Sequence, residues 1–158
     1  MRVYIASDHR GFALKKEIML YLVSKKYDVE DVGNTMLDVH DNYPEYVAKL
    51  SNSLDKETDR GIVLCGSGVG VSIAANRYSH IRCALGFDEK QIERARQDDD
   101  VNVLAIASDF ASIELSKNLV DTFLTTAFKN EEKYIRRLEK LNEHSHDNCA
   151  GCSCHNKG

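Results

Sequence analysis

A chain of 158 residues, of which 42% are hydrophobic and 29% charged, has the size of one ordinary domain and can bury a substantial core. Its net charge of −4 argues against nucleic acid or an anionic membrane surface as a partner. No apolar stretch approaches the roughly 20 residues that span a bilayer, and the first strand begins too early to leave room for a signal peptide. Five cysteines, an odd number, favour a reducing compartment. We therefore expect a cytoplasmic protein with no membrane or nucleic-acid partner.

Apolar patterns typical of strands and of helices alternate along the chain. Strand-like segments occupy residues 2–7, 27–32, 61–65, 81–86 and 101–107. Helical spacing is found in residues 11–26, 44–53, 71–77 and 89–97, around Leu115–Phe123, and around Tyr134–Leu141. Five strands that alternate with helices predict the α/β class, as a three-layer α/β/α sandwich with a five-stranded, mainly parallel, Rossmann-like sheet.

The composition changes only at His144, which divides the chain into a domain of residues 1–143 and a C-terminal tail of residues 144–158. Six soft metal ligands stand within twelve residues of this tail: His144, His146, Cys149, Cys152, Cys154 and His155. They could wrap one zinc ion, but a single compact cluster lacks the second, distant ligand pair of a zinc finger. We therefore expect a mobile tail and no structural metal.

Two polar segments follow predicted strands, at the edge of a parallel sheet where ligands bind. The segment "SDHRG" (7–11) follows the first strand, and "CGSGVG" (65–70) follows the third. Glycines that lead into a helix expose backbone N–H groups in a concave nest, which suits the anionic oxygens of a phosphate or an enediolate. The alternative is a tight turn in which glycine is needed only for packing.

Better-known glycine motifs do not match the second segment. The dinucleotide-binding pattern would need a glycine at position 71, where Val71 stands, and the Gly-Lys-Ser/Thr of a P-loop is absent. A cysteine-dependent phosphatase loop would begin at Cys65, but its phosphate-binding arginine would also fall on Val71. These three interpretations are therefore weakened, and the role of Cys65 needs another explanation.

Four motifs resemble the ribose-5-phosphate isomerase B / galactose-6-phosphate isomerase family. They are "SDHRGF" (7–12), "NYPEYV" (42–47), "GIVLCGSGVGVSIAANR" (61–77) and "NVLAIAS" (102–108). The resemblance implies an aldose–ketose isomerase of a small sugar phosphate, with the ribose 5-phosphate/ribulose 5-phosphate pair first, which acts through an enediolate without a cofactor. It also implies a homo-oligomer, at least a homodimer, in which subunits share their active sites.

The resemblance makes Cys65 the base that moves the proton between C1 and C2. A thiolate at the start of a helix is stabilised by the helix dipole, so a usable fraction is ionised. In another branch of the family a carboxylate serves as base at the position of Val71, so the cysteine version is the consistent one here. The alternative for Cys65 is a small buried hydrophobe. Cys83, in the middle of a strand, fits only that second interpretation.

Further roles follow from the same resemblance. Ser67 would carry the proton between the two substrate oxygens, and backbone N–H groups would hold the enediolate; the glycines concerned are Gly66, Gly68 and Gly70. Asp8 would accept hydrogen bonds from sugar hydroxyls, while His9 would reach the sugar or the phosphate. Asp8 could instead serve as a helix cap, and Ser67 as a turn former.

Four more positions match substrate contacts of the family. Tyr43 matches a tyrosine that lines the site, although a packed surface aromatic explains it nearly as well. Asn102 also matches a position that contacts substrate. Lys133 and Arg137 are four residues apart on one helix face and match phosphate-binding arginines, with a solvated basic face as the alternative.

Two acidic residues depart from the family pattern. Asp98 stands where the family commonly has the histidine that opens the sugar ring, and we assign that catalytic step to Asp98. Asp109 stands where a further phosphate-binding arginine is often found. These departures keep two alternatives open: an isomerase of another sugar phosphate, such as a hexose or tetrose phosphate, and a noncatalytic module that binds a phosphometabolite or senses metal.

Overall fold

The structure is a computed structural model that describes residues 1–55 and 57–146, with the side chains of residues 144–146 left out. The chain divides into two units. The first spans Met1–Phe128, and the second begins at Lys129 and contains the last helix. The candidate site described below lies entirely in the first unit.

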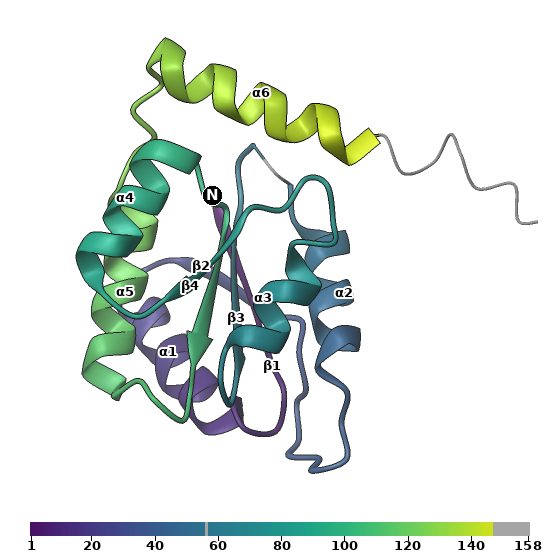
Figure 1. The fold of residues 1–158 in the computed structure, drawn as a ribbon. Helices are drawn as coiled ribbons and strands as arrows, with labels where there is room; N and C mark the ends of the chain where they lie inside the picture. The colour runs from purple at the N-terminus through teal and green to yellow at the C-terminus, as the bar shows by residue number, and fades with distance from the viewer. Residues whose placement is uncertain (56, 147–158) are drawn as a thin grey trace, which may run out of the picture. The chain divides into compact units, whose positions relative to one another are not determined.

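The first unit is built on one five-stranded sheet (Figure 1). Its strands are β1 (Arg2–Ser7), β2 (Asp28–Asp31), β3 (Arg60–Cys65), β4 (Cys83–Gly86) and β5 (Val103–Ala107). Their order is β2-β1-β3-β5-β4, and every neighbouring pair is parallel. The mainly parallel sheet expected from the sequence is therefore wholly parallel among the described strands.

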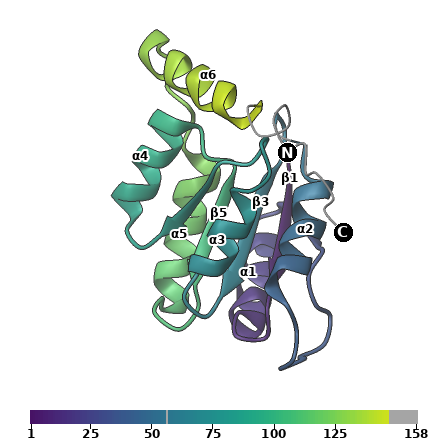
Figure 2. The same ribbon diagram turned by 45° about the vertical axis from the view of Figure 1, so that its right-hand side comes forward.

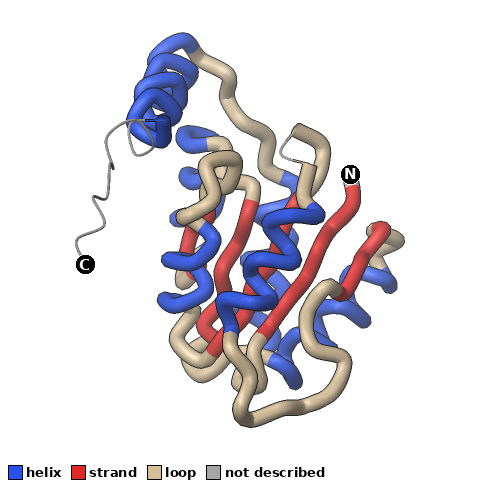
Figure 3. The backbone as a smooth tube through the Cα atoms, turned by 90° about the vertical axis from the view of Figure 1, so that its right-hand side faces the viewer, coloured by secondary structure: helices blue, strands red, loops and turns tan. Residues whose placement is uncertain are grey.

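Helices cover both faces of the sheet (Figures 1 and 2). They are α1 (Phe12–Ser24), α2 (Tyr43–Ser53), α3 (Val69–Ala75), α4 (Glu89–Asp99) and α5 (Ile113–Thr125). Figure 3 looks onto the face formed by α2 and α3. No helix within the described ranges is long and apolar enough to cross a membrane.

Side chains alternate between the two faces along each strand, which creates two apolar cores. Val3 and Ile5 of β1 join the core under α1, α4 and α5, whereas Tyr4 and Ala6 join the core under α2 and α3. The three inner strands β1, β3 and β5 are buried on both faces, and this explains their continuous apolar sequences, whereas the edge strands β2 and β4 are partly exposed. The three-layer α/β/α prediction is confirmed.

The second unit contains α6 (Glu132–His146). This helix includes residues 144–146, which the sequence analysis assigned to the tail. The four cysteine and histidine ligands of that tail beyond the helix, Cys149, Cys152, Cys154 and His155, lie outside the described residues. The prediction of a mobile tail without structural metal therefore stays a prediction.

Three strand ends meet at the carboxyl edge of the sheet. In the register of the sheet, Ser7 is paired with Leu64, and Cys65 with Ala107. The backbone bonds continue beyond the strands: the N–H of Asp8 donates to the carbonyl of Leu64 at 3.2 Å, and the N–H of Asp109 donates to Gly66 at 3.0 Å. The segments after β1, β3 and β5 are thus held side by side.

Candidate active site

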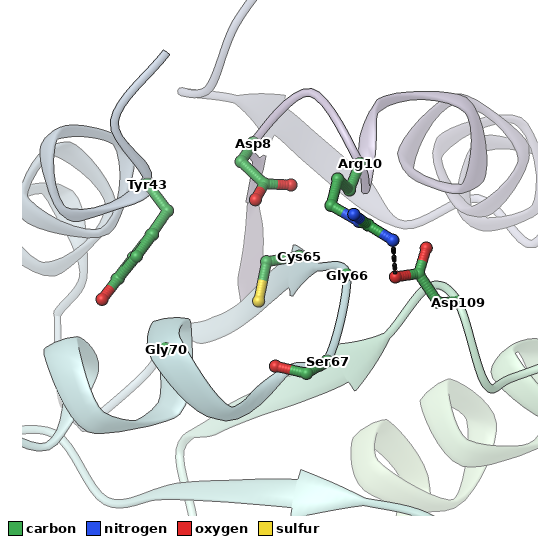
Figure 4. Close-up of a pocket in the computed structure, with 8 residues that line it drawn as sticks. All are labelled: Asp8, Arg10, Tyr43, Cys65, Gly66, Ser67, Gly70 and Asp109. Atoms are coloured by element: carbon green, nitrogen blue, oxygen red, sulfur yellow. Dashed lines mark hydrogen bonds and ion pairs between the residues drawn. The ribbon is translucent and has the colours of Figure 1, made fainter. Parts of the chain in front are cut away.

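A pocket of about 410 Å³ opens at this carboxyl edge (Figure 4). The residues that line it come from the ends of β1, β3 and β5 and from the first turns of α2 and α3: Asp8, Arg10, Tyr43, Cys65, Gly66, Ser67, Gly70 and Asp109. Six of these eight were assigned to the site from the sequence. Arg10 and Asp109 were not.

The thiol of Cys65 ends β3 and is held by the turn that follows it. Its side chain is 5% exposed, and its sulfur accepts a hydrogen bond from the backbone N–H of Gly68 at 3.2 Å. Gly68 has a φ of 72°, in the left-handed region, and it directly precedes α3. A side chain at position 68 would be strained there and would collide with Leu85. The turn therefore requires glycine in order to point its N–H at the sulfur.

The hydroxyl of Ser67 is exposed beside this thiol (Figure 4). Its oxygen accepts a hydrogen bond from the N–H of Val69 at 3.3 Å, so the residue also shapes the turn, as the alternative reading proposed. Exposure to the pocket and retention of the hydroxyl proton leave Ser67 able to donate to a bound molecule.

Gly66 and Gly70 are both approached closely by pocket side chains. A β-carbon built on Gly70 would lie 2.9 Å from Cζ of Tyr43, so the tyrosine ring lies against the glycine backbone. A β-carbon on Gly66 would lie 2.5 Å from Nε of Arg10 and 2.7 Å from a carboxylate oxygen of Asp109. A side chain at either position would displace one of these pocket side chains, so glycine keeps Arg10, Asp109 and Tyr43 where they are, and the backbone forms the floor between Tyr43 and Arg10.

Asp8 combines the two roles considered for it. It lines the pocket while its side chain accepts a hydrogen bond from the N–H of Gly11 at 3.0 Å, just before α1 begins. The residue is only 7% exposed. Burial raises the pKa of the Asp8 carboxyl above its ordinary value, and the Gly11 hydrogen bond partly opposes this rise.

His9 belongs to a polar network behind the pocket. Its Nδ1 lies 2.7 Å from a carboxylate oxygen of Asp41, and the other oxygen of Asp41 accepts from the Asn34 side chain at 3.4 Å. The ammonium of Lys15 donates to the Asn34 carbonyl at 2.6 Å and pairs with Asp31 at 2.8 Å. Lys15 is 1% exposed, although its position in the sequence suggested a polar helix face. It ties the 34–42 loop to the sheet and so supports Asp41 behind His9.

Arg10 and Asp109 form an ion pair across the mouth of the pocket (Figure 4). The hydrogen bond that the Arg10 guanidinium donates to Asp109 is the largest cause of the raised pKa of that guanidinium. Two sequence signals were available for this pair. Arg10 lies within the motif after the first strand, and Asp109 replaces an expected cation at the end of the fifth.

Asp98 and Asn102 lie at the other end of β5. Asp98 is in the last turn of α4, and Asn102 directly precedes β5, so both are at the amino edge of the sheet, away from the pocket of the same chain. The Asn102 side chain is buried, where it accepts from the N–H of Arg82 and donates to the carbonyl of His80, both at 2.8 Å. These bonds give Asn102 a structural role in joining β4 to β5.

Three consecutive aspartates, at 98–100, end α4, where their negative charges interact unfavourably with the negative end of the helix dipole. Asp100 has a φ of 45° and caps α4. Its carboxylate accepts from Arg82 and from Arg96, each at 2.8 Å. Two guanidinium groups thus offset the unfavourable charge at this helix end.

Lys133 and Arg137 belong to the second unit, so the pocket of the first unit does not include them. They share one face of α6, where the ammonium of Lys133 lies 4.6 Å from the centre of the Tyr134 ring and the guanidinium of Arg137 lies 5.7 Å from it. Lys133 also pairs with Glu131 at 3.0 Å, which raises the pKa of its ammonium. Their contact with substrate stays a prediction.

The second cysteine of the domain has a different environment. Cys83 packs against the core under α2 and α3, and burial raises the pKa of its thiol to about 12. This agrees with the core role expected for it. In the part of the chain that the structure describes, no group of three or more His, Cys, Asp or Glu side chains is arranged to hold a metal ion.

The sequence is similar to sugar-phosphate isomerases over most of its length. A family model described as Ribose/Galactose Isomerase matches residues 3–141. A probable ribose-5-phosphate isomerase B from Mycoplasma genitalium is 38% identical over 141 residues, which cover 88% of this chain and 92% of that protein. Ribose-5-phosphate isomerase B from Escherichia coli is 36% identical over 141 residues, with coverages of 89% and 93%.

Solved structures agree with these sequence matches. Ribose-5-phosphate isomerase B from Mycoplasma genitalium with bound ribulose-5-phosphate superposes with a TM-score of 0.88 at 36% identity and covers 92% of this chain and 97% of that one. The enzyme from Thermotoga maritima gives a TM-score of 0.85 at 40% identity, with coverages of 90% and 97%.

Proposed function

The chain belongs to the ribose/galactose isomerase family, and on that premise we propose that it interconverts ribose 5-phosphate and ribulose 5-phosphate. The observation that carries this proposal is the pocket in which the thiol of Cys65, the hydroxyl of Ser67 and the carboxylate of Asp8 converge. The likeness to a structure with bound ribulose-5-phosphate supports the pentose phosphate as substrate.

In this reaction Cys65 acts as the base. Its thiolate removes the proton from C2 of the open-chain aldose, which leaves an enediolate, and returns that proton to C1 to give the ketose. The hydrogen bond from the Gly68 N–H supports the anionic sulfur before the proton is taken. The sulfur is a thiol only while it holds this proton, and the thiolate is regenerated at the end of each turnover, so no redox change and no cofactor is needed.

The oxygen atoms of the substrate exchange a proton in the same step. Ser67 donates to the oxygen that becomes negative and recovers a proton from its neighbour, so that the charge moves from O1 to O2. Backbone N–H groups of Gly66 and Gly70 stabilise the enediolate, whereas the N–H of Gly68, expected to do the same, donates to the sulfur of Cys65. Asp8 and Tyr43 orient the sugar by hydrogen bonds to its hydroxyl groups, Asp8 as an acceptor and Tyr43 through its phenol.

The working enzyme is a homodimer at least, in which one subunit completes the pocket of the other. Asp98, Lys133 and Arg137 act from the partner subunit, Asp98 in ring opening and the two basic residues on the phosphate. The Asn102 side chain, buried and bonded to the segment before β4, keeps its structural role instead. The shared pocket is supported by two apolar side chains on the outer face of α3 next to the pocket: Val69 is 46% and Ile73 is 53% exposed. Analytical ultracentrifugation at micromolar concentration tests this assembly. We expect a dimer or a larger oligomer, and a monomer would contradict the proposal.

We assign the enzyme to the cytoplasm, where the reducing conditions preserve the free thiol of Cys65. One observation favours a second substrate of the same chemistry, a tetrose or hexose phosphate. Asp109 lines the pocket and gives it a negative charge at a position where the family resemblance predicted a phosphate-binding arginine.

Incubation with ribose 5-phosphate, hexose phosphates and tetrose phosphates in D₂O tests the function. Exchange with solvent deuterium appears in proton NMR as the loss of the proton signal at C2 of the aldose or C1 of the ketose. The same spectra show the appearance of the other isomer. We expect exchange and conversion, fastest with ribose 5-phosphate. Binding of sugar phosphates without exchange at either carbon would instead support the noncatalytic alternative, and preference for a tetrose or hexose phosphate would correct the substrate.

A further inference from the structure

Arg10 is the only cationic side chain among the described residues that line the pocket. Building on the isomerase function above, we propose that Arg10 is the pocket's own anchor for the phosphate group of the substrate. Asp109 serves as the positioning residue that holds the guanidinium over the glycine turn. The proposal gives this subunit a phosphate contact of its own, in addition to the basic residues assigned to the partner.

The location of the guanidinium fits an anchor. Its Nε would lie 2.5 Å from a β-carbon at Gly66, so the group lies directly above the backbone that follows Cys65. In Figure 4 the Arg10–Asp109 pair and Tyr43 lie on opposite sides of Cys65. An extended sugar phosphate can therefore place its phosphate beside Arg10 while its reacting carbons lie near the thiol and its other end near Tyr43.

The chemistry of the ion pair leaves capacity for a second anion. A guanidinium carries five N–H donors in a planar fork, and the bond to Asp109 uses one terminal amino group. The Arg10 side chain remains 58% exposed, which gives a ligand access to the other donors. Asp109 restricts the rotamers of a long side chain before the substrate arrives, which lowers the entropic cost of binding.

The position of Asp109 allows a test in which the arginine is moved from position 10 to position 109. The strands β1 and β5 flank β3 on either side, so the residues that follow them face the same space above Gly66. A guanidinium supplied from position 109 can therefore reach the region now occupied by the guanidinium of Arg10. The competing interpretation is that the Arg10–Asp109 ion pair only stabilises the turn. Moving the arginine to position 109 breaks the pair but keeps a guanidinium in the pocket, so only an anchor role predicts that phosphate binding is restored.

The experiment measures binding of ribose 5-phosphate and of inorganic phosphate by isothermal titration calorimetry, in a Cys65→Ala background so that no turnover occurs. Arg10→Ala should weaken both ligands by roughly 10- to 100-fold, the range expected for a lost charge-assisted hydrogen bond. Arg10→Lys should recover only part of this loss because it lacks the fork. The double variant Arg10→Ala/Asp109→Arg should recover most of it.

Arg2→Ala is the matched control. Arg2 is also an exposed, ion-paired arginine, with Asp28 and Glu30 as partners, but it lies at the amino end of β1. Its replacement should leave both affinities within about twofold, because screened charges at a distance add little. In the catalytically intact enzyme, Arg10→Ala should raise KM by the same factor as the loss of affinity and change kcat far less.

Unchanged affinity for both ligands in Arg10→Ala would overturn the proposal. The proposal would also be overturned if Arg10→Ala loses affinity and Arg10→Ala/Asp109→Arg does not restore it, provided that thermal melting shows all variants to be folded. Because binding is measured without turnover, these outcomes are independent of whether the intact protein isomerises ribose 5-phosphate. Failure of the isomerase function would appear instead as absent deuterium exchange in the unmodified chain.

Discussion

The backbone N–H of Gly68 donates to the sulfur of Cys65 across 3.2 Å, and this bond links the end of β3 to the start of α3. It depends on a left-handed glycine, which turns the N–H back toward the strand. A valine or isoleucine at position 65 could fill the same space at the strand end but could not accept this bond, so the turn is built around a sulfur atom and not only around an apolar volume. The relationship therefore favours the catalytic interpretation of Cys65 over the packing one.

Replacing Cys65 by alanine should abolish isomerisation and leave the fold and much of the substrate affinity intact. The side chain removed is small and lies at a strand end, so we expect about 1 kcal/mol of lost stability. Cys65→Ser should be nearly as inactive, because an unactivated hydroxyl ionises far too little at neutral pH. Coupled assays and deuterium exchange at C2 measure the loss, and urea unfolding measures the stability.

Cys83→Ala is the matched control for this pair of variants. It removes a second thiol whose pKa is raised by burial and which packs against the same core, so activity should stay within about threefold while stability falls. Full activity in Cys65→Ala, or equal losses in the two alanine variants, would remove the assignment of Cys65 as base.

Gly68→Ala should reduce both stability and turnover. A β-carbon at this left-handed position costs about 1–3 kcal/mol in strain and pushes against Leu85, so the N–H moves away from the sulfur. Gly61→Ala provides a comparison near the start of β3, away from the pocket, where a β-carbon would lie 2.8 Å from Leu50. If kcat per folded molecule falls as little in Gly68→Ala as in Gly61→Ala, then the Gly68 N–H has no catalytic role.

Asp8→Asn should make the protein more stable at neutral pH and less active. Burial raises the folded-state pKa of Asp8, so the folded chain binds this proton more tightly than the unfolded chain does. The ionised carboxylate is therefore a destabilising group above its folded pKa, and that cost fades as the pH falls through the folded pKa toward the ordinary value of about 3.9. Asparagine avoids the cost and keeps an acceptor for the Gly11 N–H.

The gap in unfolding free energy between Asp8→Asn and the unmodified protein should thus be largest near pH 7 and should close toward pH 4. Urea unfolding at several pH values measures it, and Asp8→Ala, which also loses the bond from Gly11, should be less stable than Asp8→Asn throughout. A gap that does not depend on pH would contradict the raised pKa as its cause. The accompanying rise in KM follows from the lost contact to sugar hydroxyls.

The fold and six of the eight residues that line the pocket could be predicted from the sequence because both depend on local patterns. The buried parallel strands appear as continuous apolar segments, and their carboxyl ends bring Asp8 next to Cys65 in any parallel sheet of this order. Lys15 could not be assigned, because its burial depends on Asp31 at the end of β2 and on Asn34 in the loop that follows. Helical spacing alone gives a lysine no reason to be inside.

The remaining site residues needed contacts between distant segments. Arg10 and Asp109 are 99 residues apart, and only the order of β1, β3 and β5 makes them neighbours. Asp98 and Asn102 show the converse: a sequence motif assigned them to the site, but the topology puts them at the amino edge of their own sheet. For Asp98, a role in catalysis requires a second copy of the chain, whereas the buried side chain of Asn102 is held by Arg82 and His80.

The last prediction concerns the ring-opening step assigned to Asp98. Ribose 5-phosphate is mostly cyclic, and the ring oxygen must receive a proton when the ring opens, whereas erythrose 4-phosphate cannot close an ordinary five-membered ring. A histidine near neutral pH supplies a proton readily, but an ordinary aspartate is almost fully ionised. Asp98→His should therefore raise kcat/KM for ribose 5-phosphate by roughly 10-fold, below the roughly 10²- to 10⁴-fold of a fully effective general acid, and leave erythrose 4-phosphate nearly unchanged.

Because the equilibrium constant is fixed, the gain of Asp98→His must be the same factor for ribulose 5-phosphate in the reverse direction, which provides an internal check on the measurement. Asp98→Asn is the matched variant, since it removes the charge but offers no titratable nitrogen, and it should slow ribose 5-phosphate selectively. If Asp98→His and Asp98→Asn both leave the ratio of the two aldoses untouched, then position 98 does not take part in ring opening. Ring opening would then fall to His9, whose ring is held by Asp41, or to His40 in the same 34–42 loop as Asp41. Whichever of His9→Gln and His40→Gln slows ribose 5-phosphate selectively would identify the residue.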